Sequence, residues 1–269
     1  MRWSEVGDGS CAQSGALTGR SSRCAWVSWR SVPTFAAGAV ATVAVAVFLS
    51  CRGVGRSGST VVDLAVRWWA NVWLRATGAR VVVQGLDQVD GATGYVVVSN
   101  HQSNLDPMAH LSALPLSLRF LAKRELFRIP VLGWLMRVVG MVAVDRRCVD
   151  LQQINEAAAR CLASSHSLLV FPEGTTSTGH TVDMFKDGAF AIAVINQAPI
   201  LPVTIHGSCR VWAPGRAAIH AGVVHIVVGR PLATTDLTHR DVARLRNQVR
   251  DTIESTHRDL VCAAASHAN

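Results

Sequence analysis

A histidine and an aspartate five positions apart are the side chains of this sequence best suited to chemistry. His101 and Asp106 follow the apolar run 95–98, in a polar stretch where a strand would end. Across a turn, the two side chains can come within hydrogen-bonding reach, so that the carboxylate fixes the imidazole tautomer and raises its basicity. The spacing indicates a general base with an orienting partner. The simpler interpretation is a helix cap, in which Asn104 or Asp106 caps a helix with Pro107 at its first position.

Two further strand ends carry polar side chains. After the apolar run 167–171, a compact turn contains Glu173, Gly174 and Thr175. The glycine lets backbone approach a ligand closely, the hydroxyl can donate to ligand oxygens, and the carboxylate can accept from a substrate hydroxyl or a basic residue. Arg146 follows another apolar run, and its guanidinium suits bidentate binding of phosphate. The alternatives are an ordinary turn with a solvated glutamate and an arginine in a surface salt bridge.

Functional residues gather beyond the carboxyl ends of strands in open α/β sheets, so the surrounding elements matter. Short β-rich runs alternate with helical stretches after residue 78, which is typical of an α/β layer fold. The near-continuous apolar strands predict a sheet covered on both faces. We expect strands at 80–83, 95–99, 118–122, 141–144, 167–171, 200–205 and 223–228, and helices at 105–114, 131–139, 149–164, 185–196 and 236–257.

The segment before residue 79 has a different character. Residues 32–51 carry no charge, and about 20 apolar residues suffice for a helix to span a bilayer. Residues 61–77 place tryptophans and arginines near helical spacing, which suits the headgroup layer of a membrane. A secretory signal or a buried core helix is the alternative for the first segment, and a core-packing helix is the alternative for the second.

These differences divide the chain into four parts. Residues 1–31 form a basic tail that we expect to be disordered, and residues 32–78 form membrane-inserted and amphipathic interfacial helices. Residues 79–262 form one folded domain, because no internal repeat or long linker interrupts them, and residues 263–269 form a second tail. The protein is therefore expected to associate with a membrane.

The composition narrows the range of partners. Hydrophobic residues make up 49% of the sequence, which excludes disorder for most of it, and the net charge of +8 favours anionic partners. The arginines are dispersed and no recognition motif occurs, so nucleic acid is not expected. The seven cysteines include no Cys-x-x-Cys pair, and His206, His220 and His225 lack the spacing of metal ligands. We therefore expect no disulfide framework and no metal.

Four of these segments together resemble a known enzyme family. They are residues 100–106 (Asn-His, four residues, Asp), 140–146 (Gly, then Arg six later), 171–175 (Phe-Pro-Glu-Gly-Thr) and 200–203 (Ile-Leu-Pro-Val). Their order and approximate spacing resemble the four blocks of the glycerolipid acyltransferase family. The match is most similar to bacterial 1-acylglycerol-3-phosphate acyltransferases, also called lysophosphatidic acid acyltransferases, and covers residues 80–230. It implies a mixed α/β sheet flanked by helices.

The resemblance also implies an activity. A fatty acyl group would pass from acyl-CoA or acyl-carrier protein to the free hydroxyl of a lysolipid, above all 1-acylglycerol-3-phosphate, to give phosphatidic acid. His101 would deprotonate that hydroxyl for direct attack on the thioester, with Asp106 supporting the imidazole and no acyl-enzyme. The implied partners are a lysophospholipid acceptor, an acyl thioester and membrane lipid, with no resident cofactor. The active site would lie at the cytoplasmic face of the cell membrane.

The matching positions also imply the binding residues. The acceptor head would contact Arg146, Glu173, Gly174 and Thr175, with Lys123 and Lys186 as further phosphate candidates, while Pro202 and Val203 would mark the oxyanion or acyl site. The sequence departs from the family at Thr176, where an arginine often follows Phe-Pro-Glu-Gly-Thr, and at 143–144, where an aromatic-Ile pair is common. The missing arginine removes one phosphate ligand, so a different lysolipid or a glycolipid is the alternative acceptor.

A lipid or thioester hydrolase is the alternative from another class. It would use the same histidine and aspartate but would also need an activated nucleophile. No Gly-x-Ser-x-Gly elbow occurs, and Ser103 is better interpreted as a capping or hydrogen-bonding residue in the turn of His101. A non-catalytic lipid-binding scaffold is a further alternative, and it would not need His101.

Overall fold

The computed structural model describes residues 29–52, 60–145, 151–177 and 181–266. Apolar, β-branched runs form its strands, because such side chains pack well on a pleated surface. The strands are β1 (Ala79–Gln84), β2 (Val96–Ser99), β3 (Leu118–Lys123), β4 (Val142–Val144), β5 (Ser167–Val170), β6 (Ile200–His206) and β7 (Gly222–Val228). Each expected strand is present, with ends that differ by a few residues at most.

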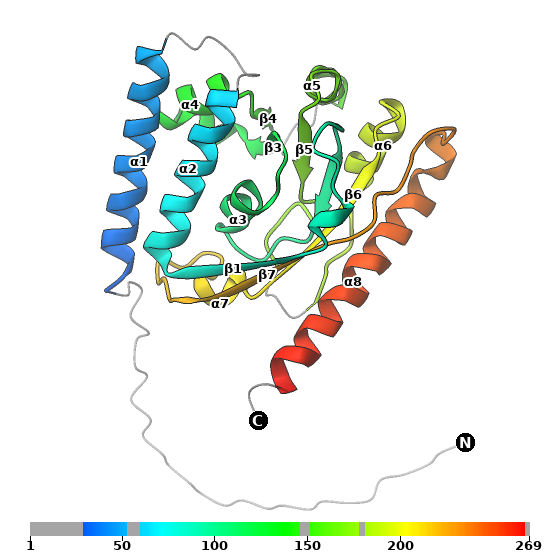
Figure 1. The fold of residues 1–269 in the computed structure, drawn as a ribbon. Coiled ribbons are helices and arrows are strands. Elements are labelled where there is room, and N and C mark those ends of the chain that lie inside the picture. The colour runs from blue at the N-terminus through cyan, green and yellow to red at the C-terminus, as the bar shows by residue number, and fades with distance from the viewer. Residues whose placement is uncertain (1–28, 53–59, 146–150, 178–180, 267–269) are drawn as a thin grey trace, which may run out of the picture.

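One sheet contains all seven strands, in the order β1-β7-β6-β2-β5-β3-β4 (Figure 1). The five strands from β6 to β4 run parallel to one another. In contrast, β7 is antiparallel to β6, and β1 is parallel to β7. The predicted mixed α/β sheet is therefore confirmed.

Helices cover both faces of this sheet. They are α1 (Ser31–Cys51), α2 (Thr60–Thr77), α3 (Asp106–Ala113), α4 (Leu132–Val139), α5 (Leu151–Ala163), α6 (Gly188–Ile195), α7 (Ser208–Val211) and α8 (Val242–Ser266), with short 3-10 helices η1 (Leu86–Gln88), η2 (Arg124–Arg128) and η3 (His239–Asp241). The last helix begins later than expected, because Thr238 and Asp241 form a capping box around η3. It also continues to Ser266, inside the segment interpreted as a tail.

The two faces of the sheet pack against different helices. Val97 belongs to a core shared with α1, α2, α3 and α4, whereas its neighbours Val96 and Val98 belong to a core shared with α5, α6 and α8. Alternate residues of a strand point to opposite faces, so one run of valines serves both cores. All three valines are fully buried, which confirms a sheet covered on both sides.

The helix pair α1 and α2 lies along one side of the molecule, opposite α8 (Figure 1). Trp69 Nε1 donates to Thr42 Oγ1 at 3.0 Å, and Thr34 Oγ1 donates to the Ala76 carbonyl at 2.9 Å, so hydrogen bonds link the two helices directly. Of α1, 33% is buried, and the helix is long and apolar enough by length and composition to cross a membrane. Val40 of α1 and Trp68 of α2 are among the exposed apolar side chains of this helix pair.

The sheet also brings the predicted functional segments together. Strands β2 and β5 are parallel neighbours with Val98 opposite Val170. Because both strands end at the same edge, the loops that begin at Asn100 and Phe171 emerge side by side. This edge is where open α/β sheets carry their ligand sites.

Candidate active site

His101 and Asp106 contact each other just beyond β2, which ends at Ser99. The His101 Nδ1 lies 2.8 Å from Asp106 Oδ2, and the exposed fractions of the two side chains are 14% and 0%. A carboxylate accepts, so Nδ1 carries the proton and Nε2 keeps its lone pair. No hydrogen bond to Nε2 is formed by the described residues. The imidazole is thus oriented on one side and open as a proton acceptor on the other.

Asp106 is held in place by the backbone of its own loop. The Gln102 amide donates to Asp106 Oδ2 at 2.6 Å and the Ser103 amide at 2.9 Å. These amides precede α3, of which Asp106 is the first residue, and the structure shows no side-chain cap for this helix. The carboxylate therefore serves the loop and His101.

Aromatic packing fixes the plane of the imidazole. The Phe171 ring stacks on His101, with ring centroids 4.2 Å apart and an interplanar angle of 17°. The other neighbour of Phe171 is His110, edge-on at 5.7 Å. Burial lowers the pKa of His110, whose Nδ1 lies 2.7 Å from the Asp106 carbonyl. Sequence reasoning missed His110, although its position four residues after Asp106 on a helix places both on one face.

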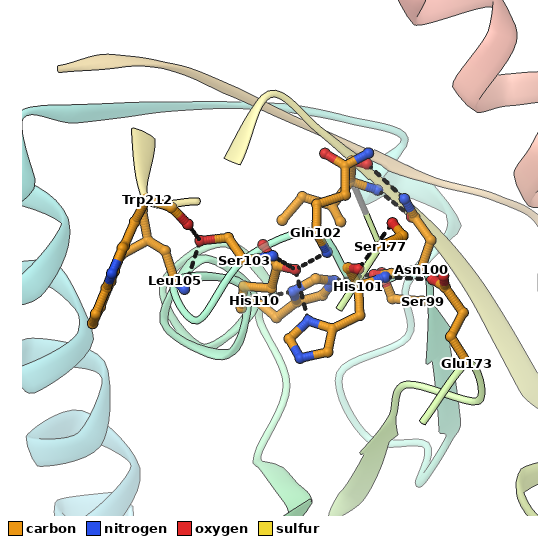
Figure 2. Close-up of polar contacts among 12 residues, drawn as sticks. Ser99, Asn100, His101, Gln102, Ser103, Leu105, His110, Glu173, Ser177 and Trp212 are labelled. Atoms are coloured by element: carbon orange, nitrogen blue, oxygen red, sulfur yellow. Dashed lines mark hydrogen bonds and ion pairs between the residues drawn. The ribbon is translucent and has the colours of Figure 1, made fainter. Parts of the chain in front are cut away.

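Glu173 supports the backbone of His101 from the neighbouring loop (Figure 2). Its Oε1 accepts from the His101 amide at 2.7 Å and its Oε2 from the Asp183 amide at 3.2 Å. The side chain is buried, and burial raises its pKa to about 7 against the lowering effect of the two amides. Ser177 completes the clamp, because its amide donates to the His101 carbonyl at 2.7 Å. Both peptide groups that flank the His101 side chain are thus tied to the loop after β5.

Two amide side chains anchor the same loop to β6 and α8. Asn100 exchanges two hydrogen bonds with the backbone of Ile205, at 2.8 and 2.9 Å. Gln102 Oε1 accepts from the Gly207 amide at 3.2 Å, and its Nε2 lies 2.8 Å from Nε2 of His257. His257 is 155 positions away in the sequence, so no local pattern could have pointed to it.

Ser103 is occupied by structural hydrogen bonds. Its Oγ donates to the Trp212 carbonyl at 2.6 Å and accepts from the Leu105 amide at 3.1 Å (Figure 2). The side chain is fully buried. A hydroxyl committed in this way is not placed as a nucleophile for His101, and this geometry disfavours the serine hydrolase alternative.

The loop after β5 brings three more predicted residues together. Gly174 has a φ of +77°, and a Cβ added there would lie 2.5 Å from Nζ of Lys186. The Lys186 amide donates to the Pro172 carbonyl at 3.0 Å, which ties the two segments together. Thr175 and the Lys186 side chain are exposed. The positive φ favours glycine at this position, and the flexible Lys186 side chain brings its ammonium group close to it.

The remaining predicted residues are more scattered. Lys123 is exposed at the end of β3, two strands from β2, and Arg146 lies outside the described residues. Pro202 and Val203 are buried within β6, where Val203 is opposite Ser99 of β2. Among the described residues, no group of three His, Cys, Asp or Glu side chains could hold a metal ion.

Comparisons with known proteins agree with this architecture. Residues 80–206 match the family model described as acyltransferase. The chain is 36% identical over 155 residues to a chloroplastic 1-acyl-sn-glycerol-3-phosphate acyltransferase of Brassica napus, covering 56% of this chain and 44% of that protein. It is 32% identical over 185 residues to the human 1-acyl-sn-glycerol-3-phosphate acyltransferase alpha, covering 68% and 65%. The chain thus spans less than two thirds of the length of these curated relatives.

A solved structure extends the comparison to three dimensions. The crystal structure of the 1-acyl-sn-glycerophosphate (LPA) acyltransferase PlsC from Thermotoga maritima is similar with a TM-score of 0.75 at 25% sequence identity. The likeness covers 86% of this chain and 94% of that one, so it includes the sheet and the helices on both of its faces. The four sequence motifs, the family model matched over residues 80–206 and the shared fold agree, and they identify an acyltransferase domain that is similar to those of 1-acyl-sn-glycerol-3-phosphate acyltransferases.

Proposed function

We propose that this protein transfers a fatty acyl group from the thioester of acyl-CoA or acyl-carrier protein to the free hydroxyl of 1-acylglycerol-3-phosphate, which gives phosphatidic acid. The observation that carries the proposal is the pair of His101 and Asp106, whose Nδ1 and Oδ2 are 2.8 Å apart while Nε2 is open. The similarity to 1-acyl-sn-glycerol-3-phosphate acyltransferases supports this acceptor.

The geometry supports direct transfer with His101 as general base. Nε2 takes the proton of the acceptor hydroxyl as its oxygen attacks the thioester carbonyl carbon. Asp106 then stabilises the imidazolium that forms, as a buried carboxylate on Nδ1 does in catalytic triads. When the tetrahedral intermediate collapses, the C–S bond breaks and the imidazolium returns its proton to the leaving thiolate. The Ser103 hydroxyl donates to the Trp212 carbonyl, so it is not placed to attack the thioester and form an acyl-enzyme.

We place the acceptor head beside the loop after β5. Lys186 provides an exposed ammonium group over Gly174 and makes no ion pair with a described residue. Thr176 stands where the family often has an arginine, and the Lys186 ammonium group can supply part of the positive charge of that missing arginine. Arg146 is a further candidate for binding the phosphate. Glu173 has both carboxylate oxygens on backbone amides, so we assign it to positioning His101 rather than to the substrate.

We further propose that the enzyme works at a membrane, with its active site at the cytoplasmic face. Helix α1 presents exposed apolar side chains along 21 residues, and α2 adds exposed Leu64 and Trp68. A lysolipid acceptor resides in a bilayer, so an apolar helix pair beside the catalytic domain keeps enzyme and substrate in one layer.

The proposal is tested by acyl transfer from oleoyl-CoA or palmitoyl-CoA to a panel of lysolipids, with products identified by mass spectrometry. We expect phosphatidic acid to form selectively from 1-acylglycerol-3-phosphate, and the His101→Ala variant to be inactive. Transfer only to another lysolipid would contradict the proposed acceptor. Release of free fatty acid without acylated product would contradict the transfer reaction and favour a hydrolase.

A further inference from the structure

A cavity whose lining does not include His101 or Asp106 lies beside the edge strand β4. Its volume is about 1020 Å³, and its lining comes from β3, α4, β4, α5 and the turn before β5. In Figure 1, α4, β4 and α5 lie together at the top of the view. The sheet order puts β5 and β3 between β4 and the strand that carries His101. The part of the cavity near Arg119 and His166 lies at the amino ends of β3 and β5, the end opposite to the catalytic loop.

Positive charge dominates this cavity. Among the described residues of its lining, the charged side chains are Arg119, Arg124, Arg137, Arg160 and a single carboxylate, Asp145. Asp145 pairs with Arg124 at 3.2 Å. No described carboxylate pairs with Arg137 or Arg160. An excess of guanidinium groups around one concave surface attracts anions.

Arg119 is the buried member of this group. Its exposed fraction is 2%, and its Nη1 donates to Asp63 Oδ1 at 2.8 Å and to the Leu118 carbonyl at 2.9 Å. The other two nitrogens, Nε and Nη2, are buried and have no hydrogen-bond partner among the residues that the structure describes. Unpartnered buried donors on a charged group carry a large desolvation penalty, which a ligand would remove.

The two free nitrogens form one edge of the guanidinium group. Nε and Nη2 present two parallel N–H bonds, the fork that matches two oxygens of a phosphate group. Arg160, exposed on the last turn of α5, lines the same cavity as the exposed Arg137. Asp63 holds the opposite edge of Arg119, so the fork is already oriented before any ligand arrives.

We propose that the Arg119 end of this cavity binds a phosphate-bearing ligand at a site separate from His101 and Asp106. Arg119 is the bidentate anchor, and Arg137 and Arg160 neutralise the remaining charge. The phosphate can belong to the nucleotide portion of a soluble acyl donor or to the head of a lipid. Both have the chemistry that the fork recognises.

The test is calorimetric titration of the purified full chain in detergent with pyrophosphate, CoA and a short-chain phosphatidic acid. Arg160→Gln removes an exposed charge that pairs with no described residue, and Arg119→Lys keeps a charge for Asp63 but removes the fork. We expect each variant to weaken pyrophosphate binding at least about tenfold, as loss of a charged hydrogen bond does. Arg240→Gln, an exposed arginine outside the cavity, is the matched control and should bind as the wild type does.

Further arms identify the source of the phosphate and separate the site from the catalytic one. If CoA binds more tightly than pyrophosphate and its affinity falls in the same variants, the phosphate belongs to the acyl donor. If phosphatidic acid behaves in this way instead, the phosphate belongs to a lipid. Lys186→Gln, in the proposed head-group region, should leave the pyrophosphate site intact.

The proposal is overturned if the wild type binds none of the three probes, or if Arg160→Gln and Arg119→Lys bind unchanged. Equal weakening in Arg240→Gln would also overturn it, since that would reflect overall charge. If Arg119→Lys fails to fold, Arg160→Gln decides alone. Because turnover is not measured, failure of the proposed acyl transfer would not affect the result.

Discussion

The catalytic loop and the helix pair α1–α2 are held to the domain by different forces. The loop from Asn100 to Asp106 is fixed by hydrogen bonds from the loop after β5, from β6 and from α8. The helix pair adds aromatic packing, in which Trp73 stacks on Trp212 at 5.9 Å and meets Phe35 edge-on at 6.1 Å, to the ion pair of Asp63 in α2 with Arg119. Hydrogen bonds are directional and apolar packing is not, so the first region can set sub-ångström geometry while the second supplies attachment and stability.

The largest effect is expected from Asp106→Asn in the catalytic loop. Oδ2 of Asp106 accepts from Nδ1–H and from both loop amides, and an amide oxygen in its place carries no negative charge to stabilise the imidazolium that forms. We expect kcat to fall by roughly three to four orders of magnitude, as in other carboxylate–histidine pairs. The control is Asp87→Asn, an exposed aspartate of η1. Steady-state kinetics that show less than a tenfold loss would contradict the role of Asp106.

The next effect concerns the helix pair. Trp73→Ala removes the ring that contacts Phe35, Trp69 and Trp212, and it should lower the free energy of unfolding by about 3 kcal/mol. Turnover per folded molecule should stay within a few-fold, because no atom of Trp73 touches the catalytic pair. Thermal unfolding measures the stability, and steady-state turnover divided by the concentration of folded protein measures the activity. A variant with normal stability and lost turnover would show that the two regions are not independent.

Glu173 should make the free energy of unfolding depend on pH, by an amount similar to the loss expected for Trp73→Ala. Its pKa is raised to about 7 in the folded protein from an ordinary value of 4.5, so the folded state holds this proton more tightly than the unfolded state. Stability from this group is therefore present below pH 4.5 and is lost as the pH rises toward 7, by up to about 3 kcal/mol. Unfolding measured against pH should show this decline in the wild type but not in Glu173→Gln.

The same variant separates positioning from binding. In Glu173→Gln one of the two amides of His101 and Asp183 loses its acceptor, which costs about 1–3 kcal/mol and loosens the loop. We expect kcat to fall about tenfold while KM for the acceptor is little changed, and Glu156→Gln, an exposed glutamate of α5, to behave as the wild type. A raised KM with unchanged kcat would instead place Glu173 on the substrate.

The smallest effect is expected at the outer face of α2. Trp68 is 50% exposed, and Trp68→Ala should weaken partition into phosphatidylglycerol vesicles by only about fivefold, because α1 keeps its apolar face. Leu86→Ala, which removes an exposed apolar side chain of η1, is the control. Partition that is identical in both variants would show that this face of α2 does not meet the membrane.

The sequence allowed the strands and the contact between His101 and Asp106 to be predicted because both depend on local pattern. The valine run 96–98 defines a buried strand, and the five-residue spacing of His101 and Asp106 crosses one turn. The support of that pair could not be predicted in the same way. Gln102 meets His257 and the His101 amide meets Glu173 across 155 and 72 positions, so these contacts exist only once the sheet has formed.

The amphipathic helix at 61–77 shows a similar limit. Its helical spacing was predicted correctly, but the spacing could not tell which tryptophans face outward. Trp68 is exposed, whereas Trp69 and Trp73 turn inward to α1 and α7. The Arg119 fork was missed for the same reason, since an arginine within an apolar strand gives no sign of the cavity beside it.

The central claim is that the open Nε2 of His101 is the base for direct acyl transfer. The most direct measurement is turnover of purified His101→Ala with an acyl-CoA and 1-acylglycerol-3-phosphate, beside its melting temperature. We predict a loss of about a thousandfold or more with a melting temperature within a few degrees of the wild type. A variant that folds equally well and keeps more than about a tenth of the activity would contradict the claim.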